Sequence, residues 1–398
     1  MLEPEYPAVN IEEHRREFPG LAQKVYLNFG GQGMLPQAAL EAIVDTYNYL
    51  EINGPFSIKS NSWLTKRASL LRQDLARELQ VDPKTLTLTE SVTAGCNIVL
   101  WGIPWQSGDR ILLGDCEHPS VVAIVEELAR RFDLAIDYAR LKVTLNQGNA
   151  IEAIKESLNP RTKLVVVSHI LWNTGQLLPI AEIVELCHRY PNGSIKVLID
   201  AAQSFGLLPL NLSELGVDYY AFTGHKWLCG PAGVGGLYIS PDAFLSLKPT
   251  FLGWRAIQDD GENQEISLKI DGQRFEVGTS AYPQYEGLRA TLATHRQWKN
   301  TQERYRDICQ LSQQLWQNLS NIPNIECLQQ QPPQTGLVCF RVKSKLTHSQ
   351  IVANLEERGC FLRTLKDSDC IRACVHYFTL PSELETLVTY LQELIEPE

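Results

Sequence analysis

Between about residues 85 and 240, short apolar runs alternate with longer segments in which apolar residues recur every three or four positions. Short runs rich in valine, isoleucine and leucine are typical of buried strands, and the longer spacing is typical of helices that cover a sheet. Strands are expected at 86–88, 110–113, 164–167, 197–199 and on both sides of residue 226, with helices such as 121–132 and 180–190 between them. This alternation predicts an α/β fold with a mostly parallel sheet and helices on both faces.

After about residue 261 the pattern changes to long polar helical segments and fewer strands. The expected elements are helices within 285–319, a strand at 336–342 and helices at 349–358 and 382–394. Such an order is typical of a smaller α+β domain. We therefore expect a large domain over 24–262 and a small domain built from 1–23 and 263–398.

The charge balance argues against some classes of partner. The chain has 398 residues, with 36 basic and 46 acidic side chains, a net charge of −10 and no dense block of lysine and arginine. Nucleic acid and anionic membranes are therefore poor candidates for a partner. Neither an apolar leader at the N-terminus nor an apolar run long enough to span a bilayer is visible, so we expect a cytoplasmic protein.

Ten cysteines are scattered from Cys96 to Cys374 without a C-x-x-C pair. In a chain of this length they indicate reduced thiols rather than a disulfide framework. Cys370 and Cys374 form the closest pair, but their spacing matches zinc ligands poorly, so no metal site is expected.

The most informative segment lies between residues 200 and 236. Asp200 ends an expected strand, and a second apolar run leads into Thr223, His225 and Lys226, which several glycines follow. The carboxyl ends of strands are where α/β sheets bind ligands, and a lysine in a glycine-lined turn can act as a nucleophile when its pKa is lowered. Pyridoxal phosphate chemistry needs such a pair, namely a lysine that forms the Schiff base and an acid that keeps the pyridine nitrogen protonated.

Together with Gln203, these residues resemble the signature of the class V pyridoxal-phosphate enzymes, the cysteine desulfurases and their relatives. The resemblance implies the PLP-dependent transferase fold of type I, with pyridoxal 5'-phosphate as the cofactor. It implies that Lys226 carries the cofactor, that Asp200 pairs with its ring nitrogen and that Gln203 contacts its phenolic oxygen. Thr223 and His225 are then implied as phosphate donors.

Two upstream stretches resemble other parts of the family's site. At 89–97, a helix start directly after a strand supplies the amides and the hydroxyl that a phosphate needs, and the resemblance assigns the amide of Val92 and the hydroxyl of Thr93 to this role. An ordinary capped helix has the same residues, so the pattern alone leaves both readings open. His118 follows another expected strand, and the resemblance implies that its ring lies flat against the pyridine.

Two further stretches match the family less closely. At 168–175, Trp172 occupies the place of the family's asparagine and Asn173 follows one residue later. Either Asn173 still reaches the phenolic oxygen through a local rearrangement, or that hydrogen bond is absent. Thr279 resembles a threonine that reaches the phosphate in the neighbouring subunit, which implies a homodimer with shared active sites. A glycine turn with a surface threonine is the alternative.

An amino-acid substrate brings a carboxylate, which a guanidinium binds best. The resemblance makes Arg372 this clamp, and Arg363 lies on an expected neighbouring strand. Two arginines can hold a substrate with two carboxylates, such as cystine. A surface arginine is the alternative for Arg363.

Desulfurases carry a nucleophilic cysteine in a loop between the positions of these two arginines, in an H-C-A segment that the long-loop group shares. The stretch 364–371 lacks that segment. Cys370 fits better within a strand, although a nucleophilic role stays open. Without such a thiol, the simple route is proton removal at Cα by Lys226, followed by loss of the β substituent.

The combined features resemble the L-cysteine/cystine C-S lyases of this family. We expect β-elimination from cystine or cysteine that gives pyruvate, ammonia and a persulfide or sulfide, which a sulfur-accepting protein takes up for sulfur transfer such as iron-sulfur cluster assembly. The alternatives are a cysteine desulfurase that forms alanine, and a transaminase or epimerase of the same family. A nonenzymatic member would keep the fold without the aldehyde-binding residues, and the presence of Lys226, Asp200 and His118 argues against it.

Overall fold

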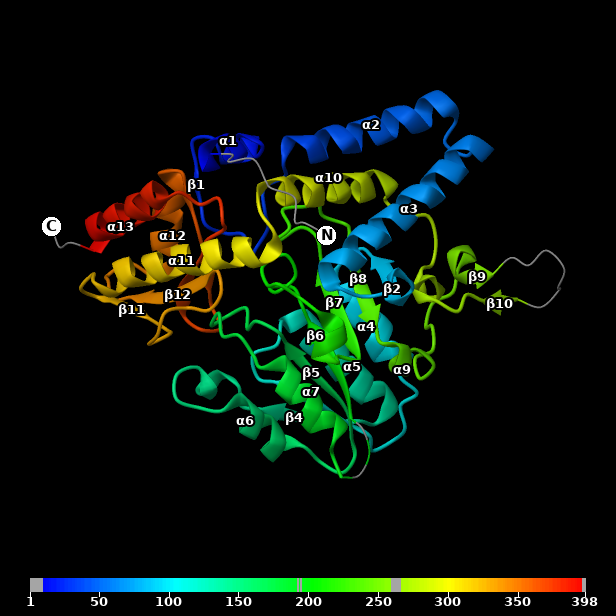
Figure 1. Ribbon diagram of the computed structural model, residues 1–398. Coiled ribbons are helices and arrows are strands. Elements are labelled where there is room, and N and C mark those ends of the chain that lie inside the picture. The colour runs from blue at the N-terminus through cyan, green and yellow to red at the C-terminus, as the bar shows by residue number, and fades with distance from the viewer. Residues whose placement is uncertain (1–9, 192, 194, 259–265, 396–398) are drawn as a thin grey trace.

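The computed structural model describes residues 10–191, 193, 195–258 and 266–395. In this part of the chain a seven-stranded sheet forms the centre of the larger half (Figure 1). All of its strands except β8 run in the same direction, so the predicted mostly parallel sheet is confirmed. In spatial order the strands are β2 (Leu86–Thr89), β8 (Gly235–Ile239), β7 (Tyr219–Thr223), β6 (Lys196–Asp200), β5 (Thr162–Ser168), β3 (Arg110–Gly114) and β4 (Ala135–Ala139).

Helices cover both faces of this sheet, as predicted. On one face lie α4 (Val92–Gly102) and α5 (Pro119–Phe132), and on the other lie α6 (Ala150–Ser157) and α7 (Ile180–His188). Successive strand residues point to opposite sides, so Val166 belongs to the apolar cluster of α4 and α5 while Val165 belongs to that of α6 and α7. Burial on both faces explains why these strands are continuous apolar runs in the sequence.

A third group of helices lies beside the β2 edge of the sheet. It contains α2 (Gln37–Asn53), α3 (Ile58–Leu79) and α10 (Tyr282–Trp298), and α10 packs against both of the others (Figure 1).

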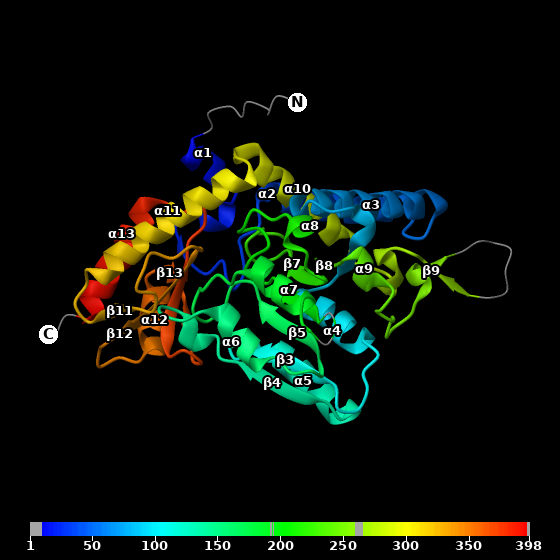
Figure 2. The same cartoon turned by 60° about the horizontal axis from the view of Figure 1, so that its bottom comes forward.

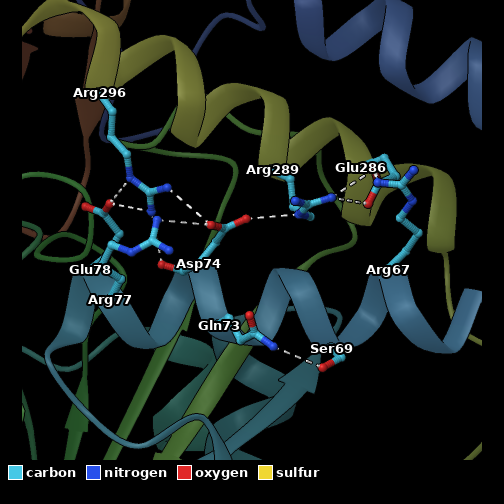
Figure 3. Close-up of polar contacts among 9 residues, drawn as sticks. All are labelled: Arg67, Ser69, Gln73, Asp74, Arg77, Glu78, Glu286, Arg289 and Arg296. Carbon is cyan, nitrogen blue, oxygen red and sulfur yellow. Dashed lines mark hydrogen bonds and ion pairs between the residues drawn. The ribbon is translucent and has the colours of Figure 1, made fainter.

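Ion pairs join α10 to α3 (Figure 3). Arg289 Nε lies 2.9 Å from Asp74 Oδ2, and Arg296 Nη1 lies 3.2 Å from Asp74 Oδ1. Arg296 Nε also donates to Glu78 Oε1 at 2.8 Å. Partly exposed ion pairs contribute little stability one by one, but a carboxylate shared by two arginines of α10 restricts how that helix can slide along α3.

A buried carboxylate fixes the chain just before α10. Glu276 accepts hydrogen bonds from Arg72 Nη2 at 2.5 Å and from the Leu88 amide at 2.9 Å, and it also pairs with Arg255. A buried carboxylate is tolerated because these charged and amide donors replace its water. The segment that leads to Thr279 is thereby held against β2, beside the start of α4.

The smaller half lies to one side of the large sheet (Figure 2). Its antiparallel sheet has the order β11 (Ile325–Cys327), β12 (Leu337–Val342), β15 (Cys370–Cys374) and β14 (Arg363–Leu365). The helices around it are α11 (Thr301–Ser320), α12 (His348–Glu357) and α13 (Pro381–Ile395). The predicted polar helical stretch is divided between α10 and α11 because Asn300 forms a capping box with Glu303 and starts a new helix.

The N-terminal segment packs on this smaller half. Arg15 of α1 (Ile11–Arg16) pairs with Glu383 at 2.5 Å, and β1 (Val25–Tyr26) pairs with β13 (Cys360–Phe361). The division between 24–262 and the rest stays a prediction. Helix α10, which that division assigns to the small domain, packs along α2 and α3.

The other elements of the described chain are short. They are α8 (Leu212–Leu215), α9 (Pro241–Phe244), β9 (Ile257–Gln258), β10 (Ser267–Leu268) and the 3-10 turns η1 (Pro19–Leu21), η2 (Pro83–Thr85), η3 (Lys142–Thr144), η4 (Trp254–Ala256) and η5 (Gly272–Phe275). Over the ranges that the structure covers, we find no helix with the length and hydrophobicity to cross a membrane.

Candidate active site

The parallel strands β3, β5, β6 and β7 end at the same edge of the sheet. His118 follows β3, Asp200 is the last residue of β6, and Lys226 follows β7. This is the edge at which α/β sheets bind ligands. The topology therefore brings together three predicted residues that are up to 108 positions apart, from 118 to 226.

Lys226 is a half-buried amine that has neither an ion pair nor a hydrogen bond to other described residues. Burial lowers the pKa of its ammonium group to about 8, the Asp200 carboxylate opposes that shift, and the Arg372 guanidinium adds to it. A lysine with a lowered pKa and a free amine is the form that attacks an aldehyde.

The turn that carries the lysine leaves no room for a side chain on the neighbouring glycine loop. A Cβ at Gly33 would lie 2.3 Å from the Lys226 carbonyl oxygen and 2.7 Å from the Cys229 Cα. The lysine turn itself therefore requires a glycine at position 33.

Asp200 is buried, and its Oδ1 accepts a hydrogen bond from the Ala202 amide at 2.8 Å. Burial raises the pKa of its carboxyl group, and the Ala202 amide, Lys226 and His118 lower it. A cationic ring nitrogen beside this acid would complete its electrostatic balance.

The described hydrogen bonds of the His118 ring involve only one of its two nitrogens, Nδ1. Its Nδ1 lies 2.7 Å from Ser120 Oγ and accepts from the Ser120 amide at 3.2 Å, while Ser120 Oγ lies 3.5 Å from Thr93 Oγ1. Burial and Lys226 lower the pKa of His118, so its ring is neutral near pH 7. The ring is exposed and meets Trp172 edge-on, with centroids 5.6 Å apart at 65°, so a face stays open to a flat ligand.

The predicted phosphate donors lie at two element ends. Val92 and Thr93 occupy the first turn of α4, where Ser91 caps the helix by accepting from the Ala94 amide. Thr223 Oγ1 lies 2.7 Å from His225 Nδ1, and burial lowers the pKa of His225 to about 4, with Lys226 adding to the shift. A helix start with hydroxyl and imidazole donors suits a phosphate group.

Thr279 lies in the segment that precedes α10. It is exposed and lines a cavity of about 210 Å³ with Ala94 and Asn97 of α4. Its role across a subunit boundary stays a prediction.

The structure separates Asn173 from this group of residues. Asn173 is buried, and its Nδ2 donates to Asp367 Oδ2 in the β14–β15 turn at 2.5 Å. Trp172 lies beside His118 instead. The Asn173 amide nitrogen has a second hydrogen, so its contact with the phenolic oxygen stays a prediction.

Gln203 stays available for that oxygen. Its Oε1 accepts from Trp227 Nε1 and its Nε2 donates to the Gly30 carbonyl, both at 2.9 Å. An amide nitrogen has two hydrogens, so one donor of Gln203 is left for a ligand. No pattern in the sequence indicates a site role for Trp227, because only the fold shows that its indole N–H orients Gln203.

The two arginines lie directly opposite each other on β14 and β15. Arg372 is 2% exposed, and its Nη1 donates to the Trp172 carbonyl at 2.8 Å. Its Nε has no hydrogen-bond partner, and no described carboxylate forms an ion pair with it. Like charges placed opposite each other and a buried unpaired guanidinium both cost free energy, and a bound carboxylate would relieve both costs.

Gly30 leaves the space for this arginine. A Cβ at Gly30 would lie 3.1 Å from Arg372 Nη2, 3.0 Å from Gln203 Oε1 and 2.8 Å from Cys374 Sγ. Cys370 and Cys374 on the same strand are completely buried. An exposed nucleophilic role for Cys370 is therefore not supported, because Cys370 lies in an apolar cluster with Cys339 and Leu365, against which Trp172 of the larger half packs.

These residues fit pyridoxal 5'-phosphate. The amine of Lys226 is unpaired, Asp200 is a buried acid at the neighbouring strand end, and the α4 start offers phosphate donors. The fit comes from the donor set itself, since no other described group occupies the free positions of Lys226 and Arg372.

Comparison with known proteins agrees with this geometry. The family profile of class V aminotransferases matches residues 25–384. A solved structure of the cystine C-S lyase C-DES in complex with its reaction product cysteine persulfide is 51% identical, with a TM-score of 0.93 and coverage of 95% of this chain and 100% of that one. A lysine-to-alanine variant of C-DES with glycine covalently linked to the PLP cofactor is also 51% identical, with a TM-score of 0.94, and covers 96% and 99%.

More distant relatives carry other activities. Isopenicillin N epimerase of Streptomyces clavuligerus is 27% identical over 93% of this chain and 94% of its own length. A probable cysteine desulfurase of Methanothermobacter thermautotrophicus is 25% identical over 97% and 98%. This chain belongs to the class V aminotransferase family.

Proposed function

We propose that this chain binds pyridoxal 5'-phosphate and is a carbon-sulfur lyase that cleaves cystine by β-elimination. The observation that carries the proposal is Arg372, a buried guanidinium without an anionic partner, directly opposite Arg363 and near a lysine with a lowered pKa. The 51% identity to the cystine C-S lyase C-DES over 95% of the chain supports it.

The residues at the strand ends would hold the cofactor. Val92, Thr93, Thr223 and His225 bind its phosphate, His118 stacks on its ring, and Asp200 pairs with the ring nitrogen. Gln203 donates to its phenolic oxygen. When bound, pyridoxal phosphate supplies an aldehyde that captures the substrate amine and a ring that accepts the electrons released at Cα.

The two arginines would select the substrate. Arg372 binds the carboxylate next to the reacting Cα, because it is buried and closest to the Gly30 loop. Arg363 is exposed at the rim and binds the second carboxylate, which cystine has and cysteine lacks. Arginine suits both roles because its planar group bonds a carboxylate through two donors.

Lys226 Nζ would remove the proton from Cα once the substrate amine has displaced it. The carbon-sulfur bond then breaks with its electron pair going to sulfur. With one water, cystine yields pyruvate, ammonia and cysteine persulfide, which balances the atoms without an external oxidant or reductant. We further propose that the persulfide passes sulfur to an acceptor protein in the cytoplasm, as in iron-sulfur cluster assembly.

The desulfurase alternative needs a mobile thiol at the site. In the described chain, the Asp367 carboxylate in the turn between the arginines accepts a hydrogen bond from the Asn173 amide. Lys142 Nζ donates to the Asp367 backbone carbonyl at 3.1 Å. Cys370 beyond it is completely buried. A turn held by these hydrogen bonds and a buried thiol both favour elimination over persulfide formation on the protein.

A homodimer with shared sites is also proposed. Four apolar side chains are exposed on α2, on the turn that follows it and at the start of α3: Val44, Ile52, Phe56 and Ile58, at 57%, 82%, 89% and 91%. Apolar exposure of this extent on neighbouring positions is typical of an interface. A second copy would bring its Thr279 to the phosphate.

Product analysis tests the reaction. The purified protein with pyridoxal phosphate and cystine is expected to form pyruvate and cysteine persulfide in equal amounts, because elimination produces one of each. Alanine as the main product would contradict the reaction, and an inverted Cα with an intact carbon-sulfur bond would identify an epimerase instead. Both products are measured by mass spectrometry, with cysteine as the comparison substrate.

Substitution of the arginines separates their roles. Arg363→Gln is expected to lower kcat/KM for cystine about tenfold and to leave that for β-chloroalanine unchanged, since only cystine has a second carboxylate. Arg372→Gln is expected to lower both. Equal losses for the two substrates in Arg363→Gln would show that Arg363 does not read the second carboxylate.

The pH dependence of cofactor capture tests the state of Lys226. The neutral amine is the nucleophile, so the rate at which the cofactor-free chain captures pyridoxal phosphate is expected to rise with pH and to level off above about pH 8. Asp200→Asn removes a carboxylate that raises the lysine pKa, so its midpoint is expected at lower pH. A wild-type midpoint near the ordinary lysine pKa of about 10.4 would contradict the lowered pKa. Capture is followed by visible absorption, with Lys226→Ala as the control that forms no band.

Sedimentation equilibrium tests the dimer. The chain is expected to have twice its monomer mass at micromolar concentration, and Phe56→Glu with Ile58→Glu is expected to shift it toward the monomer, because charged groups are costly in an apolar interface. Lys345→Glu, a charge reversal at an exposed position of the smaller half outside this group, is the control. A wild-type protein with the monomer mass would contradict shared sites.

A further inference from the structure

Four consecutive backbone carbonyls of the lysine turn each have a separate donor. The His225 carbonyl accepts from the Gly33 amide at 2.7 Å, and the Lys226 carbonyl accepts from the Cys229 amide at 2.9 Å. The Trp227 carbonyl lies 2.9 Å from His376 Nε2, and the Leu228 carbonyl lies 2.6 Å from His295 Nε2. Two of the four donors are therefore buried imidazoles from distant parts of the chain.

The turn needs these donors because it belongs to neither a helix nor a strand. It lies between β7 and β8, and Cys229 has the left-handed φ of 56°. Buried carbonyls outside regular structure must find side-chain or backbone partners elsewhere. The conformation that presents Lys226 therefore depends on groups from other elements.

The direction of each bond follows from the chemistry of the groups. A carbonyl only accepts, so Nε2 of His295 carries the hydrogen, and in a neutral ring Nδ1 is then an acceptor. Tyr377 Oη lies 2.8 Å from His295 Nδ1 and must donate to it. Its oxygen then accepts from His14 Nε2, also at 2.8 Å. Burial holds the pKa of His295 well below its ordinary value and that of His14 at about 4, with Arg304 adding to both shifts, so the rings stay neutral.

The resulting hydrogen-bond chain runs from His14 to Tyr377, to His295 and to the Leu228 carbonyl. It starts on α1, passes the end of β15 and the last turn of α10, and ends two residues after Lys226. Helix α10 is fastened to α3 by Asp74, Arg289 and Arg296 (Figure 3). Each element that supplies a donor is thus itself held in place.

The residues of this hydrogen-bond chain also connect the Lys226 turn to Arg372. His376 and Tyr377 lie two and three residues after the end of β15, the strand that carries Arg372. His376 also stacks on Trp227, with ring centroids 6.1 Å apart at 17°, and Trp227 donates to Gln203. The exit of β15 therefore sets the position of the lysine relative to the carboxylate clamp.

We propose that His295, supported by Tyr377 and His14, is a positioning residue for Lys226. Its N–H fixes the Leu228 carbonyl, and this keeps the lysine turn in register with Arg372. His376 supports the adjacent carbonyl in the same way. The inference rests on the proposed function of Lys226 as the cofactor-bearing residue.

A pair of substitutions at His295 provides the test. His295→Leu removes the donor, whereas His295→Gln keeps an N–H at the same reach. His295→Leu is expected to slow capture of pyridoxal phosphate by the cofactor-free chain about tenfold and to lower kcat for cystine by a similar factor, with KM changed less than about twofold. His295→Gln is expected to recover most of both rates.

Amide hydrogen exchange supplies a measurement that does not depend on the reaction. In the cofactor-free chain, His295→Leu is expected to raise exchange at Cys229 and Gly230, whose amides bond within the turn. His188→Leu is the matched control, since His188 bonds Asp218 at 2.8 Å at the opposite edge of the sheet and is expected to change neither exchange nor capture.

Tyr377→Phe is a second variant that tests the same proposal if His295→Leu does not fold. It removes only the hydroxyl, and it is expected to raise exchange in the turn and to slow capture to a smaller extent. Equal behaviour of His295→Leu and His295→Gln, or unchanged exchange in a folded Tyr377→Phe, would overturn the positioning role. If cystine proves not to be the substrate, capture and exchange still decide the inference by themselves.

Discussion

The structure depends on keeping one amine unpaired inside a protein. A lysine shielded from water ordinarily gains an anionic partner, but the half-buried Lys226 has none within hydrogen-bond or ion-pair distance among the described residues, and its pKa falls to about 8. Burial disfavours the charged form, and the Asp200 carboxylate limits how far the pKa falls. Around this amine, glycines at 33 and 206 let the backbone close in, since a Cβ at either would collide with the turn.

Arg372 is a second charged group of the site that lacks an ionic partner. Arg372 is buried without a carboxylate, and Arg363 lies opposite it on the next strand. Both arrangements cost free energy in the unliganded protein. Such costs persist at sites that bind a ligand of the missing charge. In the proposed function, the smaller half would bind the substrate carboxylates and the strand ends of the larger half would hold the cofactor.

Hydrogen bonds join the turn between the two arginines to the larger half. The turn between the arginines is the place where a desulfurase would carry its thiol, and here it is short and joined to the large half through Asp367 and Asn173. The displaced asparagine therefore has a structural use in this chain, and Trp172 takes its place beside His118. In the loop after β5, Trp172 therefore faces the His118 ring while Asn173 holds the turn between the arginines.

The sequence by itself determined the alternation of strands and helices, the positions of Asp200 and Lys226 at strand ends, and the family to which the motifs belong. These features are local: apolar periodicity, a glycine-rich turn and short motifs act over a few residues, so they can be read along the chain. Only the tertiary structure decided that Asn173 bonds Asp367, that Trp227 orients Gln203, and that the lysine turn depends on His295 and His376. Those contacts join residues 24 to 194 positions apart, and their partners are chosen by packing and by the need to satisfy buried polar groups, neither of which leaves a pattern in neighbouring residues.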